Sequence, residues 1–174
     1  VITNYITRRI YIMSASSNHL ENKLLDHVLR GGSSDYANPG NVFLALFSGT
    51  ASDVLAALEA GTKSKSGTGN WGHYEINNAG YSREQLTFGT DASGGSISTT
   101  GNATFTTATA NYQNSASSGS TVTCIAVMDS DYTADASSES LGNVLFYGQL
   151  DNAKEILNGD TFQVSTGNLT ISLA

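Results

Sequence analysis

Beyond residue 70, short runs of β-branched and aromatic residues alternate with clusters of Gly, Ser, Asn and Asp. The candidate strands are 72–77, 83–88, 102–107, 121–128, 143–150, 160–165 and 168–173. Thr alternates with Val, Ile, Phe and Leu in these runs, as is typical of a pleated surface in half contact with water. Seven or eight short strands at this spacing predict a mainly β fold, an antiparallel β-sandwich.

Two helices are expected before this region. Residues 18–30 form an amphipathic stripe, with Asn18 as a capping residue, Glu21 three positions later and Gly31-Gly32 at the end. If this stripe packs on the sheet, Leu24→Asp costs several kcal/mol, because it buries an unpaired charge. The apolar run 42–47 predicts a buried strand, and residues 52–60, closed by Gly61, predict a second, shorter helix.

The first 16 residues differ from the rest of the chain. Apolar Ile2, Ile6, Ile10 and Ile12 alternate in part with polar residues, which is strand-like, but no adjacent turn offers a hairpin. We therefore expect an N-terminal extension or arm over 1–16. Its alternatives are a disordered tail and a strand donated to a neighbouring subunit. Residues 17–174 have the size of a single β-sandwich domain.

Composition excludes several function classes. The formal net charge is −7 and the eight Lys and Arg residues form no basic stripe, so we expect no nucleic-acid partner. No apolar stretch approaches the roughly 18 residues that span a bilayer, so we expect no membrane partner. The one cysteine, Cys124, lies in an apolar run and predicts a small buried side chain rather than a disulfide or a thiolate metal site.

Motifs for catalysis or cofactors are weak. Gly67-x-Gly69-x-x-Gly72 has the spelling of a dinucleotide fingerprint but follows a polar loop instead of a strand. The densest carboxylates, Asp129, Asp131 and Asp135, lack the Gly and Glu of an EF-hand loop. We therefore expect no enzyme activity, no cofactor and no metal site.

One group of residues is a candidate binding site. Trp71, Tyr74 and Tyr81 cluster before the strand at 83–88, and exposed aromatic rings beside Asn and Gly bind sugars or partner surfaces in many β-sandwich modules. The alternative is that at least two of these rings pin the long loop to the sandwich.

Four segments carry a resemblance to a known family. They are S-N-H-L-E-N-K-L-L-D-H-V-L-R (17–30), N-V-F-L-A-L-F (41–47), A-G-Y-S-R-E-Q-L-T-F-G (79–89) and the closing stretch from Asn143 to Leu173. Their order resembles small structural proteins of tailed bacteriophages, including marine and cyanobacterial phages, often labelled tail fibre or virion structural proteins.

This resemblance implies a non-enzymatic subunit of the phage virion, in contact with other virion proteins and associated with the tail or tail fibre. A capsid decoration or cement protein is the close alternative. About 75 of the 174 residues are Ser, Thr, Asn or Gly, which form short hydrogen bonds at low entropic cost and suit a homo-oligomer. A hypothesis of another class is a carbohydrate-binding module for host-surface glycans, which would use Trp71, Tyr74 and Tyr81.

Overall fold

The central layer of the molecule is a five-stranded antiparallel sheet. The structure, a computed structural model, describes residues 3–6, 10–12, 15–30, 39–89, 91–114, 119–131 and 141–172, with only the backbone of the first two ranges and of Arg30. The strand order is β3-β9-β8-β4-β5. The strands are β3 (Ala15–Ser16), β4 (Val42–Ser48), β5 (Glu84–Leu86), β8 (Thr121–Met128) and β9 (Val144–Glu155).

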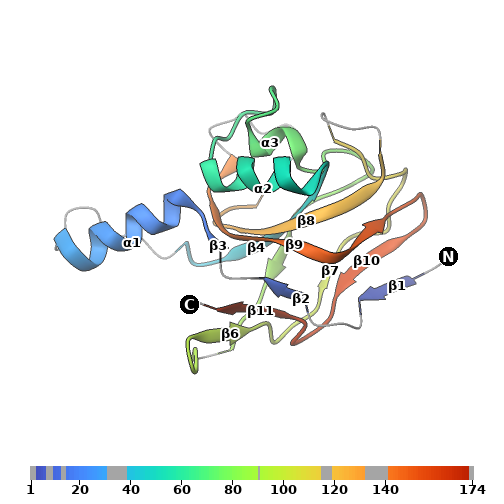
Figure 1. The fold of residues 1–174 in the computed structure, drawn as a ribbon. Coiled ribbons are helices and arrows are strands. Elements are labelled where there is room, and N and C mark those ends of the chain that lie inside the picture. The colour runs from blue at the N-terminus through green and yellow to red at the C-terminus, as the bar shows by residue number, and fades with distance from the viewer. Residues whose placement is uncertain are drawn as a thin grey trace.

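Two smaller sheets form the second layer. Their orders are β1-β10-β7 and β2-β11-β6. The strands are β1 (Thr3–Ile6), β2 (Ile10–Ile12), β6 (Ser96–Ser98), β7 (Ala103–Thr104), β10 (Thr161–Val164) and β11 (Leu169–Ser172). Figure 1 shows these sheets below the five-stranded sheet. The predicted mainly β, sandwich-like fold is confirmed.

Burial explains why the central strands were predictable. β4 and β8 are the inner strands of the five-stranded sheet, and both faces of their middle residues are covered, so the sequence of each is a nearly continuous apolar run. The expected strands at 42–47, 83–88, 102–107, 121–128, 143–150, 160–165 and 168–173 each overlap an observed strand, and β9 extends to Glu155, beyond the expected end at 150. Strand β6 was not predicted, because its sequence, Ser-Ile-Ser, has only one apolar residue.

The strand expected at 72–77 was wrong. Residues Trp71–Tyr74 form a short helix, α3, and only an isolated bridge joins Glu75 to Phe47. The apolar and polar residues alternate here, but tertiary packing decides the conformation, since the Trp71 ring is fully buried. The second expected helix is confirmed as α2 (Ala51–Ala60), which ends at Gly61 in the left-handed conformation.

The first helix, α1 (Asn18–Arg30), has the predicted bounds. Its capping residue and the packing of its apolar stripe differ from the prediction. Its capping side chain is Ser17, not Asn18, since the Ser17 hydroxyl accepts a hydrogen bond from the Leu20 N–H at 3.3 Å. The Ser17 N–H donates to the Leu145 carbonyl at 3.0 Å, which ties the start of the helix to β9. Figure 1 shows that α1 then projects from the body, whereas α2 and α3 cover the central sheet.

Candidate functional site

All three aromatic residues proposed as a binding site are buried. Trp71 has 0%, Tyr74 5% and Tyr81 7% of their surface exposed. Trp71 packs edge-on against Phe47 with ring centroids 6.4 Å apart, and Tyr81 stacks on Phe105 at 5.8 Å. The three rings therefore form no exposed platform for a sugar ring. Their burial agrees with the alternative hypothesis, in which the rings hold the long loop against the sandwich.

A buried ion pair organises this region. Arg83 donates from Nε to Oε1 and from Nη2 to Oε2 of Glu75, both at 2.7 Å, and neither side chain is more than 5% exposed. Arg83 Nη1 also donates to the carbonyls of Ser130 and Leu141, both at 2.9 Å. One guanidinium thus joins the segment after α3 to the end of β8 and the start of β9. Sequence reasoning missed this pair, because eight positions of spacing on irregular backbone carry no periodic signal.

Two aromatic rings complete the network around the ion pair. The Arg83 guanidinium lies 5.6 Å from the Trp71 ring centroid, within range of a cation–π interaction. The Tyr81 hydroxyl accepts from the Leu46 N–H and donates to Glu75 Oε1, each at 3.1 Å. Burial, with the charge of Glu75 as a second cause, raises the pKa of Tyr81 well above its ordinary value. This network stabilises a neutral phenol and a paired carboxylate, and it has a structural role.

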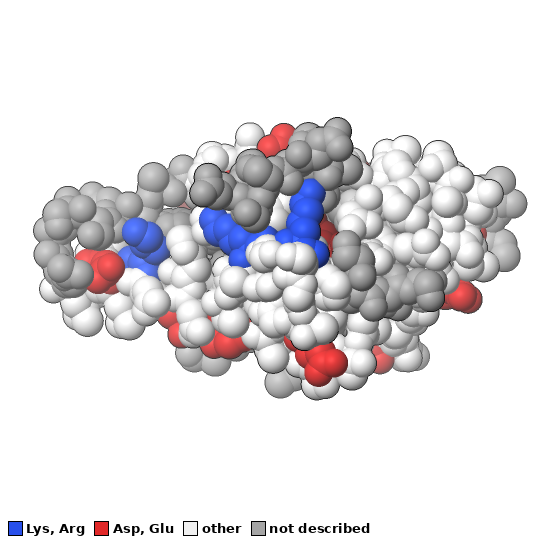
Figure 2. Space-filling view, turned by 90° about the horizontal axis from the view of Figure 1, so that it is seen from above, with Lys and Arg blue, Asp and Glu red and all other residues white. Residues whose placement is uncertain are grey.

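A polar groove lies where the segment from Thr68 to Tyr74 meets the start of α2 and β8. Its volume is about 550 Å³, and Tyr74 lines it together with Asp53, His73 and four threonines. The Tyr74 hydroxyl donates to the Thr68 carbonyl at 2.8 Å, and His73 Nδ1 lies 3.3 Å from the Lys65 carbonyl oxygen. Figure 2, which looks onto the face with α2 and α3, shows mostly uncharged surface with basic side chains gathered near its centre. Hydroxyls, one carboxylate and one imidazole are groups that bind sugar hydroxyls by hydrogen bonds.

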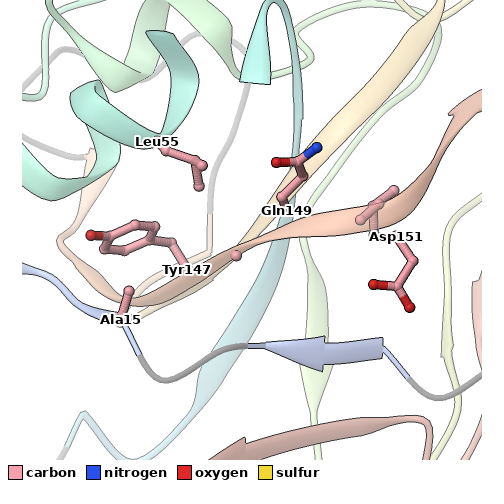
Figure 3. A pocket seen from close by; sticks show the side chains of 7 residues that line it. Ala15, Leu55, Tyr147, Gln149 and Asp151 are labelled. Atoms are coloured by element: carbon pink, nitrogen blue, oxygen red, sulfur yellow. The ribbon is translucent and has the colours of Figure 1, made fainter. Parts of the chain in front are cut away.

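A second cavity, of about 720 Å³, lies between α2 and β9. Figure 3 shows Leu55 reaching from α2 toward β9, where Tyr147 and Gln149 lie along the strand and Ala15 of β3 closes one side. The Tyr147 hydroxyl donates to the Glu59 carboxylate, and burial is the first cause that raises the pKa of Tyr147. The cavity is largely apolar and has no pair of facing carboxylates for hydrolysis.

The expected arm residues lie along two strands of the same chain. β1 pairs in parallel with β10, which places Ile6 opposite Val164. β2 pairs in parallel with β11, which places Ile10 opposite Leu169 and Ile12 opposite Ile171. Ile2 lies outside the described residues. These pairings are formed within one chain, and donation of the arm to a neighbouring subunit stays a prediction.

The described parts of the chain contain no group of three or more His, Cys, Asp or Glu side chains that could hold a metal ion. Asp129 instead accepts from the backbone N–H of Asn143 at 2.6 Å and from its side-chain amide at 2.5 Å, and Asp135 lies outside the described residues. Among the helices of the described ranges, none is long and apolar enough to cross a membrane.

Comparison with protein families decides the class of this molecule. Residues 15–172 match the family described as podophage GP4 fiber I protein gp80. The chain belongs to this phage fibre family. Its place is therefore in the virion, and its sandwich is a structural module of a bacteriophage particle. The match to the gp80 family begins at β3 and so leaves out β1 and β2. No curated protein matches the chain.

Proposed function

We propose that this gp80-family protein is a non-enzymatic structural subunit associated with the tail or tail fibre, where it forms homo-oligomers and contacts other virion proteins. The observation that carries the proposal is the family match over residues 15–172. The buried Glu75–Arg83 pair supports it, because these charged side chains are used to hold loops together and neither is presented to a substrate.

Antibody-gold labelling of intact particles tests this assignment. Label along the tail or at its tip is the expected result. Label over the head overturns the tail location and makes the protein a capsid decoration or cement protein. Absence of label from purified particles, with label in the surrounding lysate, contradicts a role as a virion subunit.

For the arm, we propose that β1 and β2 make the same parallel pairs with β10 and β11 of a neighbouring copy. Exchange of an identical element between subunits keeps every pairing and adds no new chemistry. Deletion of residues 1–12 is then expected to lower the oligomer mass and leave the sandwich folded. An unchanged mass after deletion contradicts strand donation through Ile2, Ile6, Ile10 and Ile12.

A second candidate function, recognition of a host-surface glycan, is favoured by the polar groove around Asp53, His73 and Tyr74. Trp71→Ala is a poor test, because the ring is fully buried and its loss would disturb the core. Asp53→Ala and His73→Ala change the groove directly. Both are expected to abolish binding on a glycan array, whereas Asp131→Ala, at an exposed carboxylate outside the groove, is not. Equal binding by all variants removes this function from the groove.

A further inference from the structure

Helix α1 exposes its apolar stripe. Leu24, Leu25, Val28 and Leu29 have 48%, 56%, 67% and 75% of their surface exposed. Only Leu20, in the first turn, packs against the core. A helix of 13 residues is marginal in water on its own, and most of the stability of an amphipathic helix comes from covering its apolar face. The part of the chain that the structure describes leaves that face uncovered.

Beyond its first turn, α1 exposes its large apolar side chains more than some of the polar side chains between them. Lys23 and Asp26 are half-buried, while the large apolar residues near them in sequence are exposed. This is the opposite of the pattern in a helix that packs on a core.

The same chain has an open apolar groove of about 320 Å³ between its two layers. Val42 and Val127 line it from the central sheet, and Ile171 lines it from β11. Phe88, Ile97 and Phe146 also line the groove and are only partly buried. Almost all of the lining is hydrocarbon, so water in the groove has few polar partners, and an apolar side chain would replace it favourably.

We propose that the stripe of α1 from one copy of this chain packs into this groove of a second copy. The inference rests on the homo-oligomer of the proposed function and names the surfaces that join its subunits. Both surfaces are on every copy, and among the described residues of one chain neither surface covers the other. Because the two surfaces differ, the contact is heterologous and forms a ring when its rotation closes.

The first test is the mass of the full chain by light scattering at tens of micromolar. Wild type is expected at a multiple of the 18.2 kDa chain mass. Leu25→Glu with Leu29→Glu is expected to raise the dissociation constant more than about tenfold, since burial of each leucine contributes on that scale. Leu157→Glu changes an apolar residue of similar exposure outside both surfaces and is the matched control. A monomeric wild type overturns the inference, and particle labelling then judges the virion role separately.

The second test asks whether helix meets groove or helix meets helix. Ala92→Glu puts a charge at the exposed edge of the groove and is expected to lower the oligomer mass with an unchanged circular dichroism spectrum. When this variant is mixed with the Leu25→Glu/Leu29→Glu variant, one intact helix and one intact groove remain. The expected product contains both variants and has a higher mass than either variant alone. An Ala92→Glu protein with the wild-type mass, or a mixture with no gain in mass, overturns the inference.

Discussion

The Glu75–Arg83 pair makes the sharpest prediction about stability. Arg83→Met keeps most of the volume of the side chain but removes its hydrogen bonds to the described residues, two to Glu75 and two to the carbonyls of Ser130 and Leu141. The Glu75 carboxylate, 2% exposed, would then keep only the hydroxyl of Tyr81 as a donor. The substitution thus leaves a buried charge without a counter-charge.

The expected loss follows from that stranded charge. Removal of one partner of a buried ion pair costs about 3–5 kcal/mol, whereas replacement of both partners by uncharged groups costs much less. We expect Arg83→Met to lower the free energy of unfolding by about 4 kcal/mol. The double variant Glu75→Gln/Arg83→Met should lose only about 1–3 kcal/mol, chiefly from the two carbonyls that lose the guanidinium.

Urea unfolding of the wild type, both single variants and the double variant measures this difference. The denaturation midpoints should shift while the m-values stay equal. The coupling energy between the two positions should be about 4 kcal/mol or more, because each single variant loses about 3–5 kcal/mol and the double variant only about 1–3 kcal/mol. If the losses of the single variants add up to that of the double variant within about 0.5 kcal/mol, the two side chains act independently and the reasoning is refuted.

Three further predictions concern packing. Leu24→Asp should cost less than about 1 kcal/mol in urea unfolding of the dissociated monomer, because the side chain is 48% exposed; a loss of several kcal/mol would show that the stripe is buried in its own chain. Gly72→Ala should cost about 1–3 kcal/mol, because a Cβ there would lie 2.9 Å from the Lys63 and Ser64 carbonyl oxygens, whereas Gly69→Ala meets nothing within 4 Å; equal thermal midpoints for the two variants would contradict this. Burial raises the pKa of the Cys124 thiol to about 11, so a disulfide reagent at pH 8 should modify it only after unfolding, and rapid modification of the native protein would count against its burial.

The elements that sequence analysis predicted well are those specified by local chemistry. α2 has a short apolar pattern and a glycine at its end, and β4 and β8 are buried runs bounded by polar residues. Asn18 was predicted as the capping residue of α1, one residue after the observed cap, Ser17, because both residue types are good caps. The hydrogen bond of Ser17 to β9, which favours the earlier residue, is a tertiary contact.

The candidate site could not be predicted from the same kind of pattern. Trp71, Tyr74 and Tyr81 look like a surface cluster in a loop rich in Gly and Asn, and the sequence does not show that Arg83 returns to cover Trp71. Of these three aromatic residues, only Tyr74 lines the polar groove. The groove is completed by residues of α2 and β8 that lie far from Tyr74 in sequence. Spacing indicates residues that share a helix or strand face, whereas this groove is made where loops from different elements meet.

The first helix shows how far an amphipathic pattern can be taken. The stripe Leu20, Leu24, Leu25, Val28 and Leu29 predicts that an apolar surface must cover α1, but the pattern holds no information about which molecule supplies that surface. In a monomeric enzyme the surface would be the protein's own sheet, and the sequence would look the same. In the homo-oligomer that we propose, each copy has neighbours of fixed orientation, so α1 can project and be covered by the next copy. One chain of such an assembly should show both an exposed apolar stripe, as on α1, and an apolar groove that is open to a second copy.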